Sequence, residues 1–193
     1  MAPHEPRPTA RPGEEDGRSG APSPREPTEL EQEEAARAVA LRALAAAPRS
    51  RAQLEETLLR RGTDADLAAR LLDRFEEVGL VDDAELAAMI VRTRFAEKKQ
   101  ARRAIAHELA RKGIAPHLAQ DALEQLDGDD EEEAAVELAA SRLRRTSGLP
   151  EEVRVRRALG ALGRKGYSGD VAMRAVRAAL DAESSAVGVL PEP

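Results

Sequence analysis

Two stretches of this chain are rich in arginine and lysine, the side chains whose cationic groups bind phosphates and carboxylates. Residues 92–112 and residues 142–165 each contain eight basic and two acidic residues. The pattern predicts a contact with a phosphate backbone or an acidic protein surface, although a solvated helix face is the simpler interpretation for any single arginine. The candidate partner-binding residues are Lys98, Lys99, Arg102, Arg103, Arg156, Arg157, Arg164 and Lys165.

The sequence contains no group of side chains at the spacing that catalysis or metal binding requires. The three histidines are His4, His107 and His117, and none has a nearby carboxylate pair at the spacing of metal ligands. The chain has no cysteine, which excludes thiol catalysis and zinc–cysteine sites. The acidic pair Asp82 and Asp83 is better explained by helix capping. We therefore expect no enzyme activity, no metal site and no cofactor.

Overall charge and aromatic content narrow the possible partners further. The net charge is −6, so the two basic stretches lie in an acidic chain, which disfavours a general nucleic-acid coat protein. Only Phe75, Phe95 and Tyr167 are aromatic, so stacking of single-stranded bases has little support. No segment approaches the roughly 20 apolar residues of a membrane span, and no apolar signal sequence is seen. These features predict a cytoplasmic protein without membrane contact.

A short phrase recurs three times and indicates tandem repeats. LLRRG at residues 58–62, LARKG at residues 109–113 and LGRKG at residues 162–166 each end in a glycine. The glycines Gly62, Gly113 and Gly166 are 51 and 53 residues apart, and apolar positions around them also match. A period of this size is typical of stacked supersecondary units. Each glycine is expected to end a helix.

The apolar spacing between the repeated phrases is helical, and no strand pattern persists. Ser50 followed by Gln53 has the spacing of a capping box, and Asp82 or Asp83 is expected to cap a helix at the second unit. We predict an all-α, elongated array of three three-helix repeats. Its expected parts are a disordered tail at 1–30, repeats at 31–81, 82–128 and 129–183, and a frayed tail at 184–193.

Two motifs in the second repeat resemble the RecX family of bacterial regulatory proteins. They are GLVDDAELA at residues 79–87 and ELARKGI at residues 108–114, separated by the basic turn. The family's pattern has an aromatic residue where this chain has Leu86. It also has Lys-Gly-x-Gly in the basic turn, where residues 98–101 here read KKQA. The resemblance extends over residues 33–180 and agrees with three repeated helical units.

The resemblance implies a function. Members of the family bind the RecA recombinase and its nucleoprotein filament, lie along the filament groove, and usually limit filament extension, ATP hydrolysis and strand exchange. By analogy, the eight basic residues above would face the filament, in a monomeric protein with at most a weak direct DNA contact. A stand-alone DNA-binding helical module is the main alternative, and a peptide-binding helical solenoid is a third interpretation.

Overall fold

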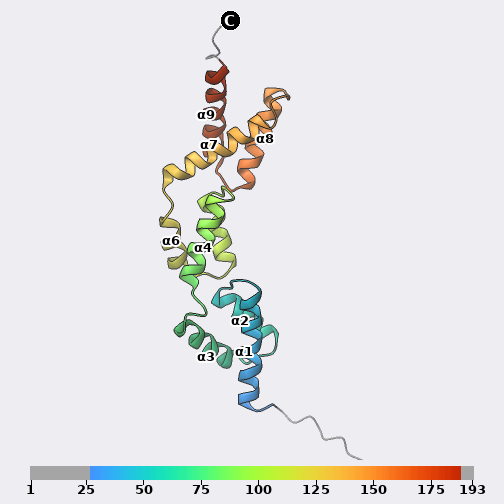
Figure 1. Cartoon of the computed structure of the whole chain (residues 1–193), viewed down its shortest axis with the longest axis vertical. Helices are drawn as coiled ribbons and strands as arrows, with labels where there is room; N and C mark the ends of the chain where they lie inside the picture. The colour runs from blue at the N-terminus through green and yellow to red at the C-terminus, as the bar shows by residue number, and fades with distance from the viewer. Residues whose placement is uncertain (1–26, 188–193) are drawn as a thin grey trace, which may run out of the picture.

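The computed structural model describes residues 27–187, and within that range it contains helices and no strand, stacked along one long axis (Figure 1). Unit 1 comprises α1 (Glu29–Ala46), α2 (Arg51–Arg60) and α3 (Ala65–Glu77). Unit 2 comprises α4 (Asp83–Ala96), α5 (Arg102–Arg111) and α6 (Pro116–Glu124). Unit 3 comprises α7 (Gly128–Arg144), α8 (Glu151–Arg164) and α9 (Gly169–Val187). The predicted all-α array of three three-helix repeats is confirmed.

Local signals set the helix ends. Ser50 forms the predicted capping box: its Oγ accepts from the Gln53 amide at 3.2 Å, and its own amide donates to the Gln53 side chain at 3.3 Å. Of the two candidate aspartates, Asp82 is the cap of α4, accepting from the Glu85 amide at 2.8 Å. At the other ends, the three repeated glycines have φ between +73° and +92°, the left-handed region that favours glycine after a helix.

Each unit has its own hydrophobic core. In unit 1, Leu54, Leu58 and Leu72 are completely buried, and in unit 2 Ile105 and Leu109 are. The core of unit 3 is built mainly from alanines around Leu143, Leu162 and Tyr167, and it includes Ala101 from unit 2. All the helix pairs that pack extensively lie within one unit. The units are therefore joined through the ends of their helices.

The ends of the described region differ slightly from the expected boundaries. The predicted tail at 1–30 lies outside the described residues as far as residue 26, and α1 already begins at Glu29, with Thr28 as its cap. At the other end a frayed segment was predicted after Glu183, whereas α9 continues to Val187. No glycine or proline interrupts the chain between these two residues, so nothing in the sequence breaks the helix before Gly188.

The basic turn between α4 and α5 takes an unusual backbone conformation. Lys99 has φ of 47°, the one non-glycine residue with a positive φ in residues 27–187. A left-handed conformation on a residue with a side chain costs about 1–2 kcal/mol. The turn thus keeps a glycine-like shape although its sequence, KKQA, lacks glycine. Contacts with unit 3, described below, hold it there.

None of the helices described between residues 27 and 187 combines the length and the apolar character that crossing a membrane requires.

Candidate partner-binding surface

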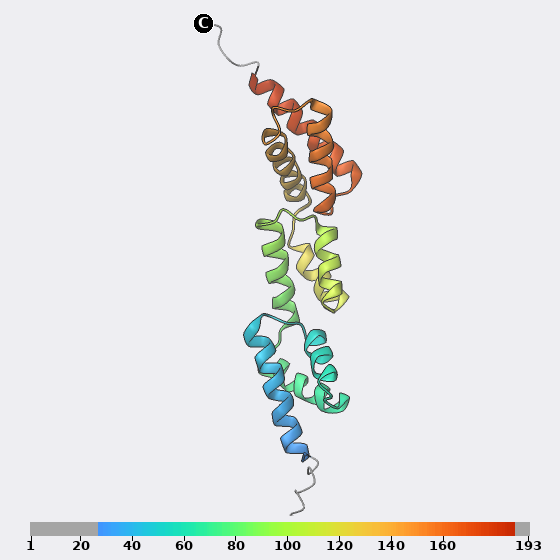
Figure 2. The ribbon, with the colours of Figure 1, turned by 90° about the vertical axis from the view of Figure 1, so that its right-hand side faces the viewer.

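The second helices of the three units follow one another along the long axis. Figure 2 shows them as one column, with orange α8 above yellow-green α5 and teal α2. At one junction, the Ala101 amide before α5 donates to the Lys165 carbonyl after α8 at 2.9 Å. At the other, the Ser50 hydroxyl before α2 donates to the Lys112 carbonyl after α5. The C-terminal end of one helix therefore meets the N-terminal end of the next, an arrangement that aligns their dipoles.

At each junction, a carboxylate accepts a hydrogen bond from the first amide of the entering helix. The amide of Arg51, the first residue of α2, donates to Asp83 Oδ1 at 2.9 Å, and the amide of Arg102, the first residue of α5, donates to Glu131 Oε1 at 3.0 Å. Both carboxylates come from the first helix of the following unit. They satisfy amides that a helix start leaves without a partner. Asp83 therefore has a second role beside its neighbour Asp82, because it caps a helix of another unit.

The repeated glycines bring the units into contact. A Cβ on Gly113 would lie 2.4 Å from the Ala52 Cβ, and one on Gly166 would lie 2.5 Å from the Ala104 Cβ. Only glycine leaves room for these alanines. The sequence predicted that the glycines end helices, which is confirmed. Their second role in the junctions was not predicted.

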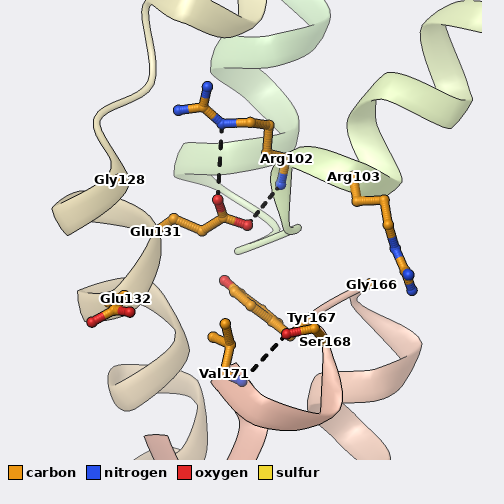
Figure 3. Close-up of a pocket in the computed structure, with 9 residues that line it drawn as sticks. All are labelled: Arg102, Arg103, Gly128, Glu131, Glu132, Gly166, Tyr167, Ser168 and Val171. Carbon is orange, nitrogen blue, oxygen red and sulfur yellow. Dashed lines mark hydrogen bonds and ion pairs between the residues drawn. The ribbon is translucent and has the colours of Figure 1, made fainter. Parts of the chain in front are cut away.

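An open cavity of about 330 Å³ lies at the junction between units 2 and 3. In Figure 3, Glu131 and Glu132 lie on one side of it, the Tyr167 ring extends across its middle, and Arg103 extends along the other side towards Gly166. The Tyr167 hydroxyl donates to the Lys99 carbonyl at 3.2 Å. Burial, together with the Glu131 charge, raises the pKa of Tyr167 to about 12. The tyrosine is therefore a neutral structural group at physiological pH.

Three of the eight predicted basic residues have partners at this junction. Lys165 donates from Nζ to the Lys98 carbonyl, and Lys99 pairs through Nζ with Glu137 at 2.9 Å. The Arg102 guanidinium donates to the Leu126 carbonyl and lies 3.9 Å from Glu131. These contacts join the basic turn to unit 3.

The other five predicted residues are exposed, and none has an ion-pair partner among residues 27–187. Arg156 and Arg164 are eight residues apart on α8, about 12 Å along its axis, and Arg157 lies seven residues before Arg164. Such spacing places side chains on one face of a helix. These five residues, the outward basic set, are Lys98, Arg103, Arg156, Arg157 and Arg164.

One further arginine belongs with this set. Arg111 is exposed on α5, eight residues after Arg103, and it precedes its repeat glycine by two residues, as Arg164 does. Arg103 and Arg156 likewise precede their glycines by ten residues. Units 2 and 3 therefore present arginines at the same two positions of the column. The repeat alignment contains this signal, although Arg111 was predicted only as part of the repeated phrase that ends a helix.

Several other charged groups in the described region form structural pairs. Arg94 of α4 binds Glu108 of α5 through two hydrogen bonds of 2.6 and 2.7 Å. Hydrogen bonding to this guanidinium lowers the pKa of Glu108, against the opposing effect of burial. Burial raises the pKa of Asp83, although its bond from the Arg51 amide acts in the opposite direction. No cluster of three potential metal ligands is found in residues 27–187.

Comparison with known proteins places these features in a family. Residues 36–75 match the first three-helix domain of RecX, residues 82–123 match the second, and residues 129–176 match the third. A protein of Streptomyces coelicolor called "Regulatory protein RecX" is 46% identical over 160 residues, which are 83% of this chain and 82% of that protein. A protein of Thermobifida fusca with the same name is 44% identical over 179 residues, 92% of this chain and 95% of that one.

Solved structures agree with the sequence comparison. The crystal structure of RecX from Lactobacillus salivarius superposes with a TM-score of 0.67 at 23% identity, covering 78% of this chain and 97% of that one, and supports the fold. A second crystal structure, titled regulatory protein RecX, gives a TM-score of 0.64 at 27% identity over 74% of this chain and 71% of that chain. All three units are matched in order by the domains of one family. The chain therefore belongs to the RecX family of regulatory proteins.

Proposed function

We propose that this protein binds the RecA recombinase and its nucleoprotein filament, and limits filament extension together with the coupled ATP hydrolysis and strand exchange. Family membership supports this proposal at the level of a regulatory role. The observation that carries it further is the outward basic set on a narrow, elongated stack. A long array with cations along one column is suited to lying along a polymer that has a regular groove and repeated acidic or phosphate groups.

The arrangement of the charges favours binding over catalysis. The strongest ion pairs and the raised pKa values lie within and between units, where they hold the helices together. The outward arginines are separated by two helical turns and do not converge on one point, so they are suited to contacting an extended anionic surface. We accordingly propose a non-enzymatic, monomeric regulator that acts in the cytoplasm, where RecA filaments assemble on the chromosome.

The direct test is ATP hydrolysis by the cognate RecA on single-stranded DNA, with this protein added at substoichiometric ratios. We expect suppression well below one molecule per RecA, because a regulator that blocks extension acts on many subunits at once. Unchanged hydrolysis, together with no co-sedimentation with filaments, would contradict the proposal.

A stand-alone DNA-binding module makes a different prediction. It would bind bare DNA as tightly as it binds filaments, with a steep dependence on salt. The regulator is expected to prefer the filament strongly over bare single-stranded DNA at the same ionic strength. Equal affinities for the two would favour the DNA-binding alternative.

A further inference from the structure

The two junctions of this protein are two copies of one binding arrangement. The receiving unit supplies a carbonyl after its second helix, a carboxylate near the start of its first helix, and a glycine without a Cβ. The entering element is the first turn of a helix that brings a hydrogen-bond donor at its cap and a small residue within the next three positions. We call the receiving surface the socket. In unit 2 it is filled by α2 and in unit 3 by α5.

Unit 1 has the carbonyl and the glycine of this socket, with Gln32 in place of the carboxylate, and no part of residues 27–187 fills it. The carbonyl of Arg61 corresponds to those of Lys112 and Lys165, but no donor within the described residues contacts it. Gly62 has φ of +82°, as the other two glycines have positive values, yet no residue of the described region lies within 4 Å of its Cβ position. Asp83 and Glu131 each stand four residues before a buried alanine of their helix, and the residue at this position of α1 is Gln32, before Ala36. The Gln32 side-chain amide donates to the Pro27 carbonyl at 3.0 Å, and its side-chain oxygen is the acceptor that unit 1 offers in place of the carboxylate.

A cavity marks the place of the missing helix. It has a volume of about 480 Å³, is formed by α1 and the turn after α2, and is lined in part by Ala36, Val39, Gly62 and Leu67. The turn residues correspond to those around the unit 3 cavity: Gly62 and Leu67 are equivalent to Gly166 and Val171. In unit 3 this cavity is bordered by α5, whereas in unit 1 none of the helices described between residues 27 and 187 takes that place.

We propose that the unit 1 socket binds the first turn of an α-helix from a partner protein. The helix would donate from its cap to the Arg61 carbonyl and from its first amide to the side-chain oxygen of Gln32, and it would place an alanine or glycine against Gly62. The positive end of a helix dipole is complementary to both acceptors. The equivalent carbonyl and glycine form a filled helix-binding interface at both junctions of this chain.

A second copy of this chain does not fit as the occupant. The free end of the column is the start of α8, where Pro150 stands at the cap position that Ser50 and Ala101 occupy in the other units. Proline has no amide hydrogen and no side-chain hydroxyl, so it cannot donate to the Arg61 carbonyl. The next residues, Glu151 and Glu152, are acidic and larger than alanine, so they do not supply the small side chain that packs against a repeat glycine. Head-to-tail growth of the array is therefore blocked by its own sequence.

The identity of the partner rests on the proposed function, in which the entering helix belongs to RecA. The chemistry of the socket can be tested without RecA, because the chain contains a helix that fits the equivalent site. The probe is a helix-stabilised peptide copying residues 49–61, added to the uniformly ¹⁵N-labelled full chain. The control peptide carries Ala52→Leu, since a larger side chain cannot approach the glycine.

The expected result is a saturable change in the NMR chemical shifts of the Arg61, Gly62 and Thr63 amides. The control peptide should bind about tenfold more weakly. Gly62→Asn in the protein should abolish the shifts, because asparagine tolerates a positive φ but fills the space. Equal shifts with both peptides, shifts confined to the Gly113 region, or no shifts would overturn the proposal.

The second experiment asks whether RecA supplies the helix. Gly62→Asn is compared with the wild type in the ATP hydrolysis assay, after urea unfolding has established that both are folded. We expect the variant to need several-fold more protein for the same suppression. If the wild type suppresses hydrolysis and the variant does so equally, RecA is not the socket's partner, although the proposed function stands. If the wild type itself has no effect, the proposed function is wrong. The peptide titration then remains the only test of whether the socket binds a helix.

Discussion

Gly166 lies against Ala104 so closely that a Cβ on residue 166 would be 2.5 Å from the alanine Cβ. The two residues are 62 positions apart in the sequence, and their contact joins unit 3 to unit 2. The same relationship between Gly113 and Ala52 joins unit 2 to unit 1. The repeat glycines therefore determine both where each second helix ends and how closely the next unit can approach.

The first prediction compares alanine at the three repeat glycines. Gly62→Ala adds only backbone strain, about 1 kcal/mol, because no residue among 27–187 lies close to its Cβ position. Gly113→Ala and Gly166→Ala add a clash with a methyl group that cannot rotate away, and should cost about 2–4 kcal/mol. Urea unfolding followed by circular dichroism measures the differences. Equal losses at all three positions would contradict the role of these glycines in the junctions.

The predictable part of the fold came from signals close together in the sequence. Ser50 and Gln53 are three residues apart, and the repeat glycines follow their helices directly. Such caps depend on local chemistry, so the sequence predicts them. The apolar period in turn predicted the number of units, because each unit must bury its own face.

The junction contacts could not be predicted in the same way. Asp83 accepts from an amide 32 residues away, and Lys165 donates to a carbonyl 67 residues away. Both depend on how one unit stacks on the next, which no local pattern specifies. For this reason the sequence grouped Lys99, Arg102 and Lys165 with the outward residues. Basic residues have the same composition signal whether they face solvent or satisfy a carbonyl at a junction.

Ionisation of Tyr167 should lower the free energy of unfolding at alkaline pH. Its folded pKa of about 12 lies above the ordinary value of 10, so its contribution is complete below pH 10 and is lost as the pH rises from 10 to 12. The loss should reach roughly 2–3 kcal/mol. Tyr167→Phe should be about 1 kcal/mol less stable at pH 7, through the lost bond to Lys99, but should lack this alkaline loss. Unfolding free energies at pH 7, 9 and 11 test both parts. Parallel pH profiles for the two proteins would contradict the assignment.

Glu108 and Arg94 form the partly buried ion pair between α4 and α5, with side chains 15% and 26% exposed. Because the pKa of Glu108 is lowered, its contribution is present above the ordinary pKa and is lost as the pH falls. Glu108→Gln should cost about 2 kcal/mol at pH 7 and reduce the acid-induced loss of stability. The matched control is Glu85→Gln, which breaks the exposed pair with Arg92 and should cost under about 0.5 kcal/mol. Similar costs for both variants would contradict this interpretation.

Asp83 gives the opposite pH behaviour. Its pKa is raised, mainly by burial, so its charged form is disfavoured in the folded protein, and the associated stability is present at low pH and lost as the pH rises through the folded pKa. Asp83→Asn keeps an acceptor for the Arg51 amide without the charge, and should be at least as stable as the wild type at pH 7. Asp83→Ala should lose about 1 kcal/mol, because the amide is left without a partner. Chemical unfolding of both variants measures their free energies of unfolding. An asparagine variant as unstable as the alanine variant would show that the charge itself is required.

The outward arginines of α8 provide the sharpest test of the proposed partner surface. Arg102 is unsuitable, because reversing its charge would also break its contacts with Leu126 and Glu131. Arg156→Glu, Arg157→Glu and Arg164→Glu together should weaken suppression of RecA ATP hydrolysis by roughly tenfold or more, since exposed cations at an anionic surface determine association.

The matched control changes the same number of charges away from the column, with Arg42→Glu, Arg70→Glu and Arg177→Glu on α1, α3 and α9, where all three residues are exposed. Both triple variants lower the net charge equally, so a difference between them reports position and not total charge. Suppression should stay within about twofold of the wild type for the control. If the two variants lose suppression equally, general electrostatic attraction explains the effect, and the column is not the contact surface.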